Sequence, residues 1–121
     1  MSATDNRFPR SVYSTGEEPD PRFSLANERT FLAWIRTSLA FVAAGVAVEA
    51  LELGIRTELR FLASITLLLL GVLCAVQAWT GWVRSERAMR RQTRLPGPTP
   101  APALIGGLIL AAVLISVGLF L

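Results

Sequence analysis

The sequence predicts an all-α membrane protein with three transmembrane helices. Hydrophobic residues make up 52% of the 121 residues. They gather into three runs, at about 31–53, 61–83 and 103–121, and the last two runs contain no charged residue. About 20 apolar residues of helix cross the hydrocarbon layer of a bilayer, so each run is long enough to span it. We expect one three-helix membrane domain over residues 21–121.

Residues 1–20 are expected to form a disordered cytoplasmic tail. They mix proline, glycine and charges of both signs without an apolar run, which is typical of a solvated segment and not of a signal peptide. Asp20 and Pro21 offer an N-cap and a first helical residue, and Ser24 is a second candidate cap. The first helix should therefore begin between Asp20 and Ser24.

The first span carries a charged side chain, Arg36, within its first third. On a helix, Arg29 and Arg36 share a face with a row of alanines, whereas the aromatic and branched residues lie on the opposite face. Small residues belong where membrane helices pack closely, so the arginine face should meet protein or water. Two interpretations stay open. Arg36 reaches individually toward the headgroups, or it lines a shared polar path, which is favoured because Arg22 and Arg29 precede it at seven-residue steps.

The first two spans should pack as an antiparallel hairpin, since a short connection that contains Gly54 joins them. The second span ends near Trp79 and Trp82, and indoles prefer the headgroup layer. The helix should continue into a basic cytoplasmic loop, 84–102, in which four prolines end it. Juxtamembrane arginines are attracted to anionic lipid by about 1 kcal/mol each, so the loop could hold lipid or a partner. Its arginines are Arg84, Arg87, Arg90, Arg91 and Arg94.

Arginine counts predict the orientation of the spans. Five arginines lie in the loop between the second and third spans, and Arg22 and Arg29 precede the first span. The hairpin connection has only Arg56 and Arg60. The positive-inside rule then places the amino terminus and the basic loop in the cytoplasm and the carboxyl terminus outside. The expected location is the plasma or inner membrane.

The stretch ANERTFLAWIRTSLAF, residues 26–41, resembles the signature of the YidH-type family of small three-span membrane proteins. The same module resembles the membrane part of the vacuolar transporter chaperone (VTC) complex, which makes and translocates polyphosphate. The resemblance implies a homo-oligomer, a pentamer by analogy, whose first helices surround a central path with basic residues at its cytoplasmic mouth. The chain lacks a soluble polymerase domain, so the resemblance does not imply polyphosphate synthesis.

Individual motif positions carry over from this resemblance. Arg29 matches the motif arginine, with Asn27 and Glu28 as its polar neighbours and Thr30 directly after it, and Arg84 matches a basic position by a looser alignment. Glu28 could act as an ion-pair partner or latch between subunits, or could simply be a carboxylate near the first helical turns.

Two functions follow as hypotheses. In the first, an oligomer binds or conducts a phosphate-type anion such as polyphosphate along a path lined by Arg22, Arg29, Arg36 and Arg84, because rings of arginine favour anions. In the second, the protein is a scaffold or accessory subunit that holds anionic lipid or a partner on its basic loop without transport. The chain has no histidine and one cysteine, so we expect no enzyme activity, metal or cofactor. No nucleic-acid partner is expected.

Overall fold

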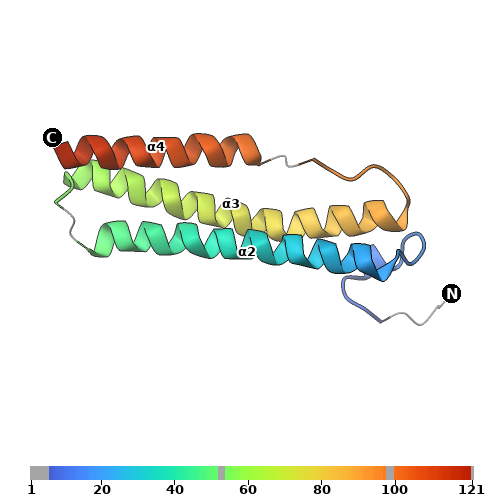
Figure 1. Cartoon of the computed structure of the whole chain (residues 1–121). Helices are drawn as coiled ribbons and strands as arrows, with labels where there is room; N and C mark the ends of the chain where they lie inside the picture. The colour runs from blue at the N-terminus through green and yellow to red at the C-terminus, as the bar shows by residue number, and fades with distance from the viewer. Residues whose placement is uncertain (1–5, 52–53, 98–99, 121) are drawn as a thin grey trace.

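The computed structural model of the chain describes residues 6–51, 54–97 and 100–120. Its regular elements are all helices, in the order α1 (Arg10–Tyr13), α2 (Pro21–Ala50), α3 (Thr57–Arg90) and α4 (Ala101–Phe120) (Figure 1). The three longer helices are each long and apolar enough to cross a membrane. This confirms the predicted all-helical fold and the predicted number of candidate spans in the described residues.

The ends of α2 follow the expected chemistry. Asp20 is the N-cap, and its Oδ1 accepts a hydrogen bond of 2.9 Å from the backbone N–H of Arg22, while Pro21 occupies the first turn. Helix α2 ends at Ala50, before the predicted end of the span. Residues 52–53 lie outside the described residues, and Gly54 has φ of 74°, a left-handed conformation that glycine adopts without strain.

Helices α2 and α3 pack closely through serines and glycines. The Ser38 hydroxyl on α2 donates to the Gly71 carbonyl on α3 at 2.6 Å, and Ser64 on α3 donates to the Gly45 carbonyl on α2 at 2.7 Å. A Cβ built on Gly71 would lie 3.1 Å from the backbone carbonyl oxygen of Ser38, and one on Gly45 would lie 3.0 Å from the backbone carbonyl oxygen of Ser64. Because the two glycines have no side chain, the two backbones can approach closely, as small residues allow in membrane helix pairs.

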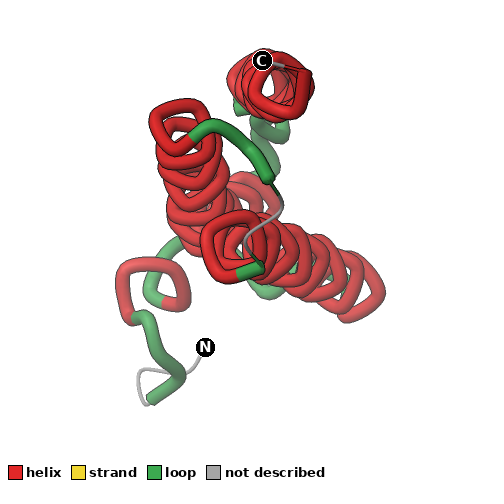
Figure 2. Tube along the Cα trace, turned by 90° about the vertical axis from the view of Figure 1, so that its left-hand side faces the viewer, coloured by secondary structure: helices red, strands yellow, loops and turns green. Residues whose placement is uncertain are grey.

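Helix α4 packs along α3. Gly107 and Gly118 lie against Leu70 and Ile55, and Ala111 is buried in a cluster with Leu67 and Val48. Figures 1 and 2 show α4 on one side of the α2–α3 pair and the N-terminal segment on the other. Most of the large apolar side chains of α4 are exposed, which suits a helix that faces lipid.

The helices differ in length, and this divides the molecule into a membrane part and a projecting part. With 20 residues, α4 is about 30 Å long and matches the hydrocarbon layer, whereas α2 is about 45 Å and α3 about 51 Å long. Gly107, seven residues into α4, lies beside Leu70, next to the Gly71 that bonds to Ser38. Arg36 therefore lies level with the first turns of α4. Residues 21–33 of α2 and 77–90 of α3 project beyond α4, and we call these residues the tip.

The N-terminal segment, residues 6–20, differs from the disordered tail that its composition predicts. It contains α1 and returns along α3, where the Glu17 N–H donates to the Arg90 carbonyl at 2.9 Å. Gly16, with φ of 57°, lies so close to the Arg90 carbonyl that a Cβ would collide with it. The difference has a physical reason, because the partners of this segment lie on a helix about 70 residues away in the chain. Residues 1–5 of the predicted tail lie outside the described residues.

The close approach at Gly71 leads to a stability prediction. Gly71→Val would push a branched side chain into Val42 and the Ser38 carbonyl, and overpacking of this kind costs about 1–3 kcal/mol. Gly106→Val is the matched control, since a Cβ there meets nothing within 4 Å. Thermal unfolding in detergent should show a lower Tm for Gly71→Val only. Equal Tm values for the two variants would contradict this packing.

Candidate functional site

The polar residues that could carry a function gather at the tip and on the segment beside it. Glu86 on α3 is 2% exposed, and its carboxylate accepts hydrogen bonds from the Ser24 hydroxyl at 2.7 Å and from the Asn27 amide at 3.2 Å. Asn27, itself buried, also donates to the Trp82 carbonyl at 3.1 Å. Buried carboxylates need such donors, because an unpaired one would lose its hydration without compensation. The motif residue Asn27 thus ties α2 to α3.

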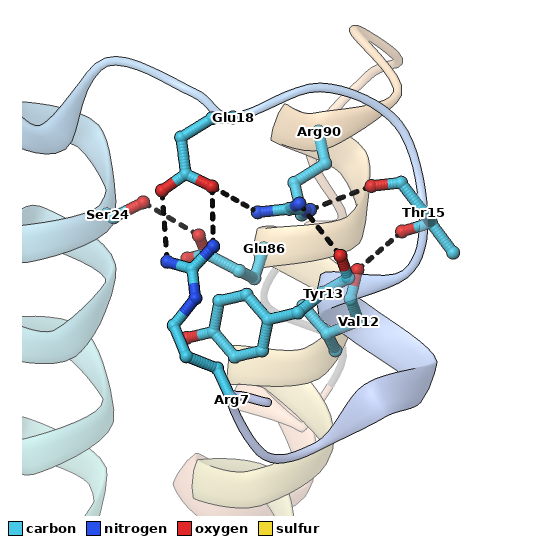
Figure 3. Close-up of polar contacts among 8 residues, drawn as sticks. All are labelled: Arg7, Val12, Tyr13, Thr15, Glu18, Ser24, Glu86 and Arg90. Atoms are coloured by element: carbon cyan, nitrogen blue, oxygen red, sulfur yellow. Dashed lines mark hydrogen bonds and ion pairs between the residues drawn. The ribbon is translucent and has the colours of Figure 1, made fainter. Parts of the chain in front are cut away.

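Arg90 ends α3 and anchors the N-terminal segment (Figure 3). Its side chain is 5% exposed and donates to the Thr15 carbonyl at 2.8 Å, the Tyr13 carbonyl at 3.0 Å and the Glu18 carboxylate at 3.0 Å. Glu18 also accepts two hydrogen bonds from Arg7, at 2.7 and 3.0 Å. Paired donors of this kind are the geometry in which arginine binds carboxylate most strongly. Glu18 therefore joins Arg7 of the N-terminal segment to Arg90 at the end of α3.

These contacts shift the titration of groups on the N-terminal segment. Hydrogen bonds from Arg7, and then from Arg90, lower the pKa of Glu18 from 4.5 to about 2. Hydrogen bonds from Arg22 lower the pKa of Asp20. Burial, followed by the charge of Glu86, raises the pKa of Tyr13. The ionised Glu18 carboxylate is therefore one of the groups that hold the segment to Arg90 at the tip.

The structure separates the four arginines that were predicted to line an anion path. Arg22 forms an ion pair with Asp20 at 2.8 Å. Arg29 and Arg36 are exposed on α2, and neither makes a hydrogen bond or ion pair with any other residue that the structure describes. Arg29 lines a pocket of about 420 Å³ with Thr30, Ala33, Trp34, Thr37 and Leu104. Arg84 lies on α3, away from this pocket.

Arg84 groups instead with arginines of the basic loop. A pocket of about 280 Å³ at the end of α3 is lined by Arg84, Arg87, Arg91 and Arg94, together with Ala88, Thr93 and Pro96. Arg87 also donates to the Ser11 carbonyl at 3.2 Å. Arg90 lies apart from this set, because its guanidinium is occupied by the N-terminal segment. Four of the five predicted loop arginines thus share one surface.

The other motif residues take different positions. The Thr30 hydroxyl donates to the Ala26 carbonyl at 3.3 Å, one turn earlier on α2. Glu28 is exposed and faces the aromatic residues Phe31, Trp79 and Trp82. Adjacent positions on a helix differ by about 100°, so Glu28 and Arg29 lie on different surfaces.

Comparison with known proteins identifies the family. A family model described as "Domain of unknown function (DUF202)" matches residues 22–88, which cover all of α2 and α3 except Pro21, Met89 and Arg90. The chain belongs to this family. The predicted YidH type is confirmed by the inner membrane protein YidH of Escherichia coli, which is 44% identical over 107 residues, or 88% of this chain and 92% of that protein.

Relatives in two other bacteria are also similar to this chain. An uncharacterized protein of Mycobacterium tuberculosis is 45% identical over 96 residues, which cover 77% of this chain and 78% of that protein. The same YidH protein is found in Shigella flexneri at 44% identity. No solved structure gives a significant match. With three candidate spans and an inner-membrane relative, the family member described here is a multi-pass inner membrane protein, as predicted.

Sequence reasoning missed the polar contacts that organise the tip. Glu86 carries one available signal, since it is the only acid in the stretch 84–95, which is rich in arginine. Its partner Ser24 is recognisable from the sequence only as a candidate helix cap. Glu18 and Tyr13 gave no signal, because their roles depend on where the N-terminal segment docks.

Removal of the Arg90 guanidinium should release the N-terminal segment. Arg90→Gln loses a charged donor to Glu18 and two carbonyls, and hydrogen bonds to charged groups contribute about 1.5–3 kcal/mol, so amides in residues 14–17 should exchange roughly tenfold faster or more. Arg91→Gln is the control, because Arg91 is exposed. Hydrogen exchange with mass spectrometry measures both variants. Unchanged protection in Arg90→Gln would show that the segment docks without this anchor.

Acid should also release the segment. The pKa of Glu18 is lower in the docked state than its ordinary 4.5, so its contribution to docking is complete above pH 4.5 and is lost as the pH falls toward 2. Tryptophan emission should report this change, because Tyr13 packs 6.2 Å from Trp82. Glu17→Gln should keep the transition, and Glu18→Gln should lack it. The same transition in both variants would assign it to another group.

Proposed function

We propose that the protein is a non-enzymatic, oligomeric membrane module that binds a phosphate-type anion on the arginine face of α2 and passes it toward the membrane. Arg29 and Arg36 are the residues of this site. The observation that carries the proposal is that both are exposed on the same helix, without a hydrogen bond or ion pair to any described residue.

The energetics of Arg36 support an oligomer. Arg36 lies level with the first turns of α4, inside the hydrocarbon layer if α4 marks its limits. An arginine at the centre of a membrane helix costs about 2.5–3.5 kcal/mol, and less near the edge, where it reaches headgroup water. A neighbouring subunit or a bound anion reduces this cost further. The exposed alanines on the same face, Ala33, Ala40 and Ala43, leave room for a second helix to approach.

The proposal includes an orientation. We place the α2–α3 pair as an antiparallel hairpin with the amino terminus and the tip in the cytoplasm and the carboxyl terminus outside. The distribution of arginines supports this orientation, since the tip and its connection to α4 are far richer in arginine than the turn at Gly54. Arg29 would then lie at the cytoplasmic mouth, and Arg36 about 10 Å deeper along α2.

The choice of a phosphate-type anion is supported by chemistry and by resemblance. Guanidinium groups offer forked donors that match phosphate oxygens, and rings of arginine favour anions over cations. The motif around Arg29 resembles that of the polyphosphate-translocating VTC membrane module. Inorganic phosphate and short polyphosphate are therefore the first anions to test, with a pentamer as the assembly to look for.

A second candidate function is favoured by the four-arginine pocket at the end of α3. Arg84, Arg87, Arg91 and Arg94 line it without an acidic neighbour in that lining, which suits an anionic lipid headgroup or an acidic partner. In this case the protein is a scaffold or accessory subunit without transport. The two functions use different arginines, so substitutions separate them.

Liposome flux of labelled phosphate and short polyphosphate tests the first function. Arg29→Gln and Arg36→Gln should each lower flux roughly tenfold or more, because a lost charged hydrogen bond costs about 1.5–3 kcal/mol. Arg56→Gln is the control, since Arg56 is an exposed arginine at the opposite end. Flux that is unchanged in both variants, or a detergent-solubilised mass of one chain, would favour the scaffold. Loss of lipid binding in a variant with Arg84 and Arg91 replaced by Gln would support it directly.

A further inference from the structure

A pocket between the N-terminal segment and the tip has a composition unlike the arginine surfaces. Its volume is about 390 Å³, within the range of small-ligand sites. Five aromatic side chains line it, from the N-terminal segment, α2 and α3, and the only charged residue of the lining is a carboxylate. These residues are Phe8, Tyr13, Phe31, Trp79, Trp82 and Glu28.

The rings form a continuous wall. Phe8 stacks on Trp79 with centroids 6.0 Å apart, Trp79 stacks on Trp82 at 5.6 Å, and Trp82 meets Tyr13 at 6.2 Å. Aromatic pairs at such separations stabilise one another beyond the area that they bury. Because Phe8 and Tyr13 come from the N-terminal segment, the wall is complete only while the segment is docked on Arg90.

The Glu28 carboxylate is not paired with a cation among the described residues, and its charge is one of the causes that raise the pKa of Tyr13, after burial and Glu86. Its carboxylate is exposed and makes no hydrogen bond or ion pair with another described residue. The nearby guanidinium groups of Arg7 and Arg90 are both bound to Glu18. The pocket therefore offers a negative charge beside electron-rich ring faces.

Two arginine side chains of the protein lie close to an aromatic ring in this region. The Arg7 guanidinium lies 4.2 Å from the centroid of the Tyr13 ring, and that of Arg90 lies 5.2 Å from it. Both distances are within the range of cation–π attraction, which is strongest for tryptophan. Trp79 and Trp82 have no such partner among the described residues and remain for a ligand. The preference of tryptophan for the headgroup layer would explain the two indoles, but it would not explain the carboxylate that faces them.

We propose that this pocket binds an organic ammonium group. Aromatic walls bind quaternary ammonium ligands, and ring faces also attract primary ammonium groups such as that of lysine. A nearby carboxylate adds an opposite charge. Two sources supply this chemistry, a zwitterionic lipid headgroup and a soluble organic cation. The pocket lies at the tip, beyond the start of α4 and so at headgroup level, where either source can reach it. This site is separate from the arginine face and does not depend on anion transport.

Equilibrium dialysis with radiolabelled tetramethylammonium tests the pocket on the full-length protein in a maltoside detergent. Binding should be saturable and should persist in sodium chloride of matched ionic strength. Glu28→Gln should weaken it by about fivefold, as expected for the loss of one Coulomb partner near a surface. Glu17→Gln is the matched control, because it removes the same charge from the same end of the molecule without lining the pocket. Trp79→Phe should retain binding, and Trp79→Leu should abolish it.

Native mass spectrometry distinguishes the two sources. The protein is released from nanodiscs that contain phosphatidylethanolamine and phosphatidylglycerol in equal amounts. Retention of phosphatidylethanolamine by the wild type, and its loss in Glu28→Gln, supports the site with a lipid headgroup as its ligand. Tetramethylammonium binding without lipid retention supports the site with a soluble cation. The proposal is overturned if neither probe binds, or if Glu28→Gln binds both as well as Glu17→Gln does.

Discussion

The close approach of α2 and α3 is the constraint on which the rest of the structure depends. Hydrogen bonds from Ser38 and Ser64 to the carbonyls of Gly71 and Gly45 fix the two helices in one register. In that register Asn27 meets the buried Glu86, and both helices extend past the start of α4. A slip of one residue would turn Glu86 by about 100° and leave the carboxylate without its donors. The polar chemistry of the tip is therefore a consequence of apolar packing deeper in the helix pair.

The sequence predicted much of the fold for physical reasons that are local. Three apolar runs, an Asp-Pro helix start and proline after the basic segment depend only on neighbouring residues. The family motif could also be recognised, because its residues are contiguous. The docked N-terminal segment could not be predicted in this way, since Arg90 and Glu18 are 72 residues apart and each has a common surface composition around it. This pairing depends on the end of α3 lying beside the chain that precedes α2.

The candidate site was predictable only in part. Helical periodicity puts Arg29 and Arg36 on one face of α2, and both side chains are exposed in the single chain. It could not show that Arg22 would pair with Asp20, because capping brings these two side chains together at the helix start. The hypothesis of a basic loop also counted Arg90 with four neighbours in sequence that share a surface, whereas the end of α3 turns Arg90 toward Tyr13 and Glu18. Spacing along one helix cannot reveal which residue another segment covers.

The arrangement of charges on α2 has a consequence for how the family motif is interpreted. Glu28 and Arg29 are adjacent in the chain and of opposite charge, yet they line different pockets. At about 100° apart they cannot act as one ion pair on the same subunit surface. If each charge has its own ligand, a cation belongs on the aromatic side and an anion on the alanine side. The motif is then better understood as two sites on one helix than as a single polar cluster.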